Sequence, residues 1–450
     1  MPIADPMPVL TDAELATRLE RLTESGVRLL AGSVVDMAGV ARAKTVPLRR
    51  AGVFHTAGMG ASPTWNVFCA DNAIAFTDRL GVVGDLRLRA DLAAARVIGE
   101  GWAWAPAEFF DQYGEPSPNC ARGRLRSLQA GAEASGLTVR AGHELEFVLT
   151  DGEDPALSDR HWQAYGLGSV LREGGFLVDL SRALEEAGLG VEQLHAEYGT
   201  GQFELSLAPR DPLRAADEVV LARLLTGRVA RDHGLLASFS PLPFHDGPGN
   251  GAHLHLSLER GGRPLLSGGD GPHGLTAEGR AAIAGIVEGL PEVTGVLSGS
   301  LLSAGRLAPG RWSGAFACWG LENREAAVRL VAATPGSPHG ASVEVKSGDP
   351  SANPYLASAV VLGLALDGIA RDAVLPPETT VDPADDPAAR RLPAGQTEAL
   401  DALEASATAR ALLGEDIVAA LLAVRRHEAE AYGDLGPAVL AERFRFAWSS

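Results

Sequence analysis

Cysteine is scarce in this chain: Cys69, Cys120 and Cys318 are the three cysteines among 450 residues. Three is an odd number, and their spacing does not suit a thiolate metal site, so neither a disulfide framework nor a structural zinc cluster is expected. The opening segment, MPIADPMPVL, lacks the basic residues that begin a signal peptide. We therefore expect a reducing, cytoplasmic location.

Long apolar runs and positive charge are also lacking. No apolar run reaches the length that crosses a bilayer, and 57 acidic against 39 basic residues give a net charge of -18. This charge disfavours nucleic acid and anionic membranes as partners. The chain has no Walker loop, glycine-rich kinase loop or dinucleotide fingerprint. A bound nucleotide would therefore be held by side chains and metal ions.

Apolar content is ample, since 46% of the residues are hydrophobic, which is enough for two domains. Residues 1–107 combine an amphipathic helix at 12–25 with short strand-like runs, and we expect a small α+β domain there. Residues 108–450 are expected to form the larger domain. A helix at 119–135, capped by Asn119, should open it.

Two histidines occur in the run GNGAHLHLSL at residues 249–258. Side chains alternate between the two faces of a strand, so His253 and His255 should point the same way. The preceding glycines allow a tight turn and the close approach of a ligand. Such imidazoles suit a divalent metal or a phosphate oxygen. The alternative is a pair of half-buried strand histidines bonded to their neighbours.

Carboxylates occupy other strand-like runs of the same region. HELEF carries two glutamates at alternate positions, and the glycine turn of EYGTGQFE should bring two more side by side. A buried carboxylate costs several kcal/mol, roughly, unless it is paired or binds a metal; the alternative is a solvated strand face. Carboxylates with one imidazole suit Mg²⁺ or Mn²⁺ better than structural zinc. The candidate ligands are Glu144, Glu146, Glu197, Glu204, His253 and Glu344.

Three charged residues outside this set have two interpretations each. Arg324 and Arg329 lie close in the sequence and suit phosphate oxygens, although surface arginines paired with carboxylates are the alternative. Together with two bound cations, the two arginines would bind nucleotide phosphates during phosphoryl transfer. Asp36 stands in an otherwise apolar strand, where an aspartate commonly caps a turn.

Five motifs follow one another along the chain: HELEF, EYGTGQFE, GNGAHLHLSL, NREAAVRL and VEVKSGDPSANPYLASA. On these motifs the chain resembles the glutamine synthetase family, of the bacterial type I kind, over nearly its whole length. The resemblance implies an α+β fold, with an N-terminal β-grasp domain and a C-terminal catalytic domain built on a curved antiparallel sheet with helices. It also implies a homododecamer of two stacked six-membered rings, with each active site between subunits.

The same resemblance implies ATP as a co-substrate and two to three Mg²⁺ or Mn²⁺ ions at each site. The residues that match ligands of the first ion are Glu146, Glu197 and Glu204, and those that match ligands of the second are Glu144, His253 and Glu344.

Other matches concern the substrates. The residues that match nucleotide contacts are His255, Ser257, Arg324 and Arg329, and those that match the glutamate site are Gly249, Arg306 and Lys346. Arg306, Arg324 and Asp36 match groups that take part in catalysis. The resemblance places Asp36 in the ammonium pocket of a neighbouring subunit.

The chain also departs from glutamine synthetases. A flap glutamate that lines their ammonium site, six residues after the position of Arg306, is here Trp312. Lys346 replaces an arginine that binds glutamate, and it lacks the guanidinium fork. Leu242 and Pro248 replace a lysine and an asparagine. The run WSGAFACWGLENREA around the tryptophan looks like the glutamate–amine ligase branch of the family.

These departures predict an ATP-dependent ligase that joins the γ-carboxylate of L-glutamate to a primary amine through γ-glutamyl phosphate. Trp312 would provide a wall for the carbon chain of the amine; the alternative is a packed aromatic without substrate contact. A short amine such as ethanolamine is slightly favoured over a polyamine, because no acid is evident beside Trp312. The remaining alternatives are a true glutamine synthetase that uses ammonia and a non-catalytic assembly.

Overall fold

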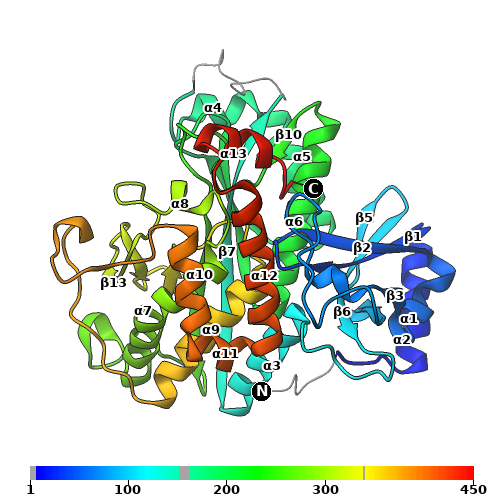
Figure 1. Ribbon diagram of the computed structural model, residues 1–450, viewed down its shortest axis with the longest axis horizontal. Coiled ribbons are helices and arrows are strands. Elements are labelled where there is room, and N and C mark those ends of the chain that lie inside the picture. Colours follow the sequence, from blue (N-terminus) through cyan, green and yellow to red (C-terminus); the bar gives the residue numbers. More distant parts are fainter. Residues whose placement is uncertain (1–6, 152–161, 338–339, 450) are drawn as a thin grey trace.

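The computed structural model of this protein describes residues 7–151, 162–337 and 340–449 (Figure 1). It contains a six-stranded sheet near the N-terminus and a ten-stranded sheet in the larger remainder. In Figure 1 the blue N-terminal sheet lies to one side of the long central strand β7 (Leu137–Thr150). Among the described residues, no helix combines the length and apolar content that crossing a membrane requires.

The smaller sheet is mixed, as the expected β-grasp fold requires. Its order is β2-β1-β6-β4-β3, with β5 paired to β6, and β1 runs parallel to β6 but antiparallel to β2. Two helices close a small core that contains Leu22, Leu30, Phe54 and Leu88. The elements are α1 (Asp12–Glu24), β1 (Leu29–Val35), β2 (Ala41–Pro47), α2 (Ala51–Thr56), β3 (Met59–Ala61), β4 (Leu86–Ala90), β5 (Arg96–Gly99) and β6 (Trp102–Phe110). Because β6 continues past residue 107, the division between 1–107 and 108–450 stays a prediction.

The larger sheet is curved and mostly antiparallel, in the order β16-β13-β14-β15-β11-β7-β9-β8, with β10 on β7 and β12 on β11. The exception to the expected antiparallel arrangement is β13, which pairs with β14 in parallel. The further strands are β8 (Val191–Ala196), β9 (Gln202–Arg210), β10 (Leu236–Ser238), β11 (Ala252–Arg260), β12 (Arg263–Pro264), β13 (Phe316–Leu321), β14 (Ala326–Val331), β15 (Ser342–Val345) and β16 (Arg390–Arg391).

Helices cover the apolar side of this sheet. Helices α3, α6 and α7 pack against its strands, and α9 packs against all three of these helices (Figure 1). The helices are α3 (Ala121–Ala134), α4 (Leu167–Arg172), α5 (Gly174–Glu186), α6 (Pro212–Asp232), α7 (Ala277–Leu297), α8 (Ser303–Arg306), α9 (Pro354–Ala370), α10 (Gln396–Ala405), α11 (Ala407–Leu413), α12 (Glu415–Tyr432) and α13 (Pro437–Phe444). The expected cap of α3 was wrong: Cys120, not Asn119, accepts the capping bond, from the N–H of Gly123.

The alternation of side chains on the central strands fixes where the polar groups lie. On β7 the odd-numbered residues Val139, Leu145 and Phe147 are buried in the core, whereas Glu144 and Glu146 lie on the opposite face and are half-buried. Strand β11 repeats the pattern. One face of the sheet therefore packs on helices, and the other face carries the acids and histidines singled out by the sequence.

Candidate active site

Strand register brings the candidate ligands together on the polar face of the larger sheet. Glu144 on β7 is directly opposite His253 on β11, and Glu146 on β7 is opposite Glu204 on β9. Residues directly opposite on antiparallel strands have Cβ atoms about 4.5–5.5 Å apart. Four positions spread over 110 residues of sequence thus become direct neighbours.

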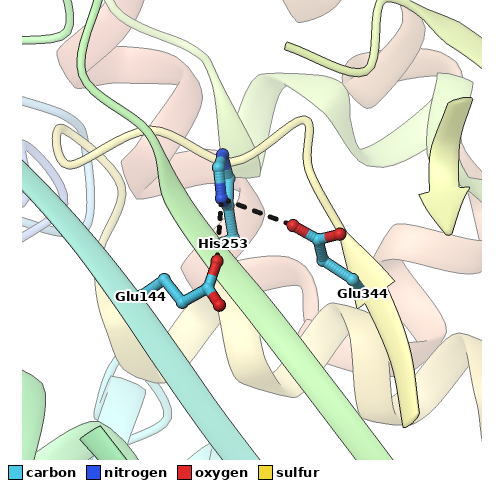
Figure 2. Close-up of side chains that lie close together, drawn as sticks. All are labelled: Glu144, His253 and Glu344. Atoms are coloured by element: carbon cyan, nitrogen blue, oxygen red, sulfur yellow. Dashed lines mark hydrogen bonds and ion pairs between the residues drawn. The ribbon is translucent and has the colours of Figure 1, made fainter. Parts of the chain in front are cut away.

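One group of possible ligands consists of Glu144, His253 and Glu344, which come from β7, β11 and β15 (Figure 2). The Nδ1 atom of His253 lies 3.2 Å from Oε2 of Glu144 and 3.5 Å from Oε1 of Glu344. The carboxylates point toward the same edge of the imidazole ring, as Figure 2 shows. The three residues can offer ligand atoms within 4.8 Å of one another.

A second group shares His253 and adds Glu146 and Glu204. Hydrogen bonds to one carboxylate oxygen of Glu146 hold that side chain in position. That oxygen, Oε2, accepts from the N–H of Gly251 at 2.8 Å and from the amide of Gln202 at 3.0 Å. The oxygen Oε1 of Glu146 faces His253, with Nε2 of the ring 3.8 Å away.

A third group contains His195, Glu197 and Glu204. The expectation that every acid would stand on a strand was wrong for Glu197, which lies just beyond the end of β8. The turn after it brings it beside Glu204, as the glycines predicted. His195 was missed, although it stands two residues before Glu197 and so shares its face, the same spacing that drew attention to His253. The ring Nε2 lies 3.1 Å from Glu197 and 3.8 Å from Glu204.

The electrostatics of the cluster show an excess of negative charge. Burial raises the pKa of Glu204 to about 9, and the neighbouring charges of Glu144, Glu146 and Glu197 add to the shift. For Glu344, burial would raise the pKa, but the charge of Lys346 and those of the nearby histidines outweigh burial and lower it to about 2.

Glu144 and His255 form an ion pair at the edge of the same cluster. Burial opposes ionisation of Glu144, yet the hydrogen bond with His253 and the ion pair with His255 hold its pKa well below the ordinary value. The pKa of His255 is raised, because its ion pair with Glu144 outweighs burial. The two groups lie 3.2 Å apart.

The donor set fits a divalent cation that prefers oxygen. Carboxylates dominate each of the three groups, and the cysteines are buried elsewhere. A cation between these acids would oppose both the burial and the repulsion that raise the pKa of Glu204. Oxygen ligands with one or two imidazoles suit Mg²⁺ or Mn²⁺ better than a structural zinc ion.

Arg306 and Lys346 are cationic side chains that reach the cluster. Arg306 is buried, and its Nη2 lies 3.2 Å from Nε2 of His253 and donates to the carbonyl of Lys346 at 3.0 Å. Its Nη1 is also buried and forms no hydrogen bond among the described residues. The ammonium of Lys346 lies 3.1 Å from Glu344. A guanidinium nitrogen left without a partner beside the cluster is suited to a substrate carboxylate.

Of the residues expected to contact a nucleotide, only some lie beside the acidic cluster. Arg329 on β14 lies 3.2 Å from Glu344 and also pairs with Glu322. Arg324 lies exposed in the turn between β13 and β14. Ser257, two residues after His255 on β11, donates to the carbonyl of Ala341. Their roles toward a nucleotide remain predictions.

Asp36 lies just after β1, in the turn that leads to β2. Its carboxylate is buried, with Oδ1 accepting from the N–H groups of Ala38 and Val40 and Oδ2 from Nε of Arg42 at 2.8 Å. Burial raises its pKa to about 6, and Arg42 limits that rise. These contacts are those of a turn cap, and the role of Asp36 toward a neighbouring subunit stays a prediction.

Trp312 lies in the loop that follows α8. Trp312 is 58% exposed, so it is not packed in the core, and its contact with a substrate stays a prediction. Its backbone N–H donates to the buried carboxylate of Glu325 at 2.7 Å. The sequence interpretation had found no acid beside Trp312, and the structure places one there. Nothing in the run NREAA signals that Glu325 is buried, since burial depends on the loop packed over it.

Gly251 is a position where the site should tolerate no side chain. An added Cβ would meet Nε2 of His253 and lie 2.9 Å from Nη2 of Arg306 and 3.0 Å from Oε1 of Glu146. We expect Gly251→Ala to weaken Mn²⁺ binding, measured by calorimetry, by about 10–100-fold, the range for disturbing groups that orient metal ligands. Gly247→Ala is the control, because its Cβ would meet nothing closer than 3.5 Å. Equal affinities in the two variants would contradict the proposed crowding.

Comparison of the sequence with known families and proteins gives a consistent result. Residues 118–437 match the family model described as the glutamine synthetase catalytic domain. The chain is 41% identical to the gamma-glutamylpolyamine synthetase of Streptomyces coelicolor, with 97% of each chain covered. It is 33% identical to a glutamine synthetase of Mycolicibacterium smegmatis, with 71% of this chain and 74% of the relative covered.

Solved structures are similar over almost the whole chain. A structure described as a novel glutamine synthase homolog has a TM-score of 0.85 at 32% identity, with 94% of this chain and 99% of that chain covered. An ADP complex of GmaS has a TM-score of 0.82 at 27% identity, with 93% and 96% covered. The fold of this chain is therefore that of these proteins.

Proposed function

Because this chain belongs to the glutamine synthetase family, we propose that it is an ATP-dependent ligase that joins the γ-carboxylate of L-glutamate to a primary amine through γ-glutamyl phosphate. The observation that carries this proposal is the cluster of carboxylates around His253, with the unpartnered guanidinium nitrogen of Arg306 beside it. Such a cluster concentrates cations and an anion-binding group at one place, as phosphoryl transfer to a carboxylate requires.

The cation ligands follow from the three groups. We propose that one ion is held by Glu146, Glu197 and Glu204, and another by Glu144, His253 and Glu344, as the resemblance implies. Such ions, when bound, neutralise the charge of the nucleotide phosphates. His195 is added as a candidate ligand, because it lies beside Glu197 and Glu204.

The remaining groups of the chain bind and orient the substrates. Arg306 would hold the carboxylate of glutamate through Nη1, and the close approach of Gly249 to Arg306 keeps that side chain in place. Arg329, Arg324, His255 and Ser257 are the proposed contacts of ATP. Lys346 is bonded to Glu344, so it orients a proposed metal ligand and leaves glutamate recognition mainly to Arg306. Positioning and charge neutralisation of this kind are the main contributions an enzyme makes to such a reaction.

The amine is proposed to be a polyamine. The S. coelicolor relative, which aligns with 97% of this chain, is named for that substrate class. The slight preference for ethanolamine rested on the lack of an acid beside Trp312, and Glu325 removes that reason. We therefore propose that ammonia is a poor substrate, and that Trp312 lines the path of the carbon chain.

Assembly and location remain proposals based on the family resemblance. They comprise a homododecamer with active sites between subunits, a cytoplasmic location, and the division of the chain at residue 107.

Phosphate release with ATP, Mg²⁺ and glutamate tests the function directly. We expect putrescine or spermidine to give a kcat/KM about a hundredfold or more above that for ammonium, because a site shaped for a larger amine leaves its polar groups unpaired around a small one. Ethanolamine and a monoamine complete the panel. Turnover with ammonium alone would restore a glutamine synthetase, and no turnover with any amine would favour a non-catalytic assembly.

A further inference from the structure

Glu325 is a buried carboxylate that the family motifs leave without a role. It stands just before β14 and is 8% exposed. Its Oε1 accepts from the N–H of Trp312 at 2.7 Å. Its Oε2 is buried, and no described residue donates a hydrogen bond to it. A buried carboxylate oxygen is costly without a partner, so a donor from outside the chain would stabilise it.

The loop above Glu325 lies against the cluster. Gly314 in this loop approaches β15 so closely that a Cβ there would lie 2.9 Å from Cβ of Lys346 and 2.9 Å from Cα of Ala327. Lys346 in turn contacts Glu344, one of the proposed metal ligands. Glu325 therefore lies at the border between the loop of Trp312 and the proposed reaction site.

The negative charge near Glu325 is not balanced by an ion pair to Glu325. Burial raises the pKa of Glu325; Asp382 raises it further, and Lys346 lowers it. Lys346 is bonded to Glu344, and it forms no ion pair with Glu325. Glu325 and Asp382 are thus two acids close to each other, and Glu325 is bonded to the loop that carries the exposed Trp312. An alkyl chain with a terminal ammonium would match both features.

We propose that Glu325 binds a second, non-reacting ammonium group of the amine substrate and so selects a diamine or polyamine over a monoamine. This inference rests on the proposed function of the chain as a glutamate–amine ligase. Glu325 would be a specificity-determining residue, with the backbone of the Trp312 loop fixing one oxygen while the other receives the substrate.

Glu325→Gln separates this role from a purely structural one. The amide oxygen can still accept the N–H of Trp312, so the loop stays tethered, but the negative charge is lost. We expect the KM for putrescine and spermidine to rise about 10–100-fold, the range for losing a hydrogen bond to a charged group. The KM values for ATP and glutamate, and kcat/KM for butylamine, should stay within about twofold of wild type, since none of these measurements involves a second ammonium.

Glu378→Gln is the matched control. Glu378 also accepts a backbone hydrogen bond, from Leu321 at 2.9 Å, but pairs with His273 instead of facing the Trp312 loop. The Glu378→Gln variant should have the same KM values as wild type for every substrate. If Glu325→Gln fails to fold, Asp382→Asn provides the second variant, because Asp382 is exposed and should shift the polyamine KM in the same direction by a smaller factor.

The outcomes separate the inference from the function. A wild-type enzyme active on polyamines, with unchanged polyamine KM in these variants, would overturn the inference alone. If Glu325→Gln changed kcat/KM for butylamine and the KM values for glutamate and ATP as much as the polyamine KM, the inference would also be overturned, because Glu325 would then only hold the loop in place. A wild-type protein inactive with every amine would overturn the function, and the inference with it.

Discussion

Glu204→Gln should reduce ATP-dependent ligation by more than about a hundredfold while the fold remains intact. Even groups that only orient a metal ligand contribute about 10–100-fold, and Glu204 belongs to two of the three candidate ligand groups. Phosphate release at saturating glutamate and amine measures the loss, and circular dichroism checks the fold. Glu192→Gln, an exposed carboxylate on the neighbouring β8, should leave the rate unchanged. Near-normal turnover of Glu204→Gln would show that the ligand assignment is wrong.

The same variant has a consequence for stability without metal. The pKa of Glu204 is raised from 4.5 to about 9 in the folded chain, so the folded chain holds a proton that the unfolded chain releases. This contribution to stability is full below pH 4.5 and is lost as the pH rises through about 9. The thermal stability of the metal-free wild type should fall over that window. Glu204→Gln should show a smaller fall, and added Mg²⁺ should stabilise the wild type more than the variant.

Arg122→Met should destabilise the whole protein by roughly 3–5 kcal/mol, the cost of removing one partner from a buried ion pair. Arg122 on α3 is 3% exposed. It binds Asp217 on α6 through two bonds of 2.8 Å, Glu108 on β6 at 2.7 Å and Asp91 at 3.0 Å. Asp217 also accepts from the hydroxyl of Tyr355 on α9. The guanidinium therefore ties the N-terminal sheet to three helices of the larger part.

Urea unfolding monitored by fluorescence measures this loss. The matched control is Arg182→Met, since Arg182 pairs with Asp179 on the exposed side of α5, at 63% and 46% side-chain exposure. Exposed pairs of this kind contribute roughly 0–1 kcal/mol. If the two variants lost similar stability, the buried network would not be the anchor that its geometry indicates.

The composition of the site could be predicted because it depends on local rules. Glu144, Glu146, His253 and Glu344 share one face because strand side chains alternate with a period of two, which any short segment reveals. The turn between Glu197 and Glu204 could be predicted from its glycines. His195 obeys the same alternation and was missed although the signal was present.

For other residues the sequence allowed two structural interpretations. Asp36 suits a turn cap and also matches a catalytic position of the family; its contacts with Arg42 and the turn backbone are those of a cap, and its role toward a neighbouring subunit stays a prediction. Arg324 and Arg329 lie five apart in the sequence, yet Arg329 reaches Glu344 while Arg324 is exposed. The direction of a side chain in a turn depends on contacts that neighbouring residues do not specify.

The sequence by itself determined which chemical groups this protein has and which of them alternate onto one face of each strand, because these properties depend on neighbouring residues alone. Only the tertiary structure decided the register that sets Glu144 against His253, and the packing that buries Glu325 under the loop of Trp312. Register and burial arise from hydrogen bonds and contacts between segments far apart in the chain, so no short stretch of sequence contains them.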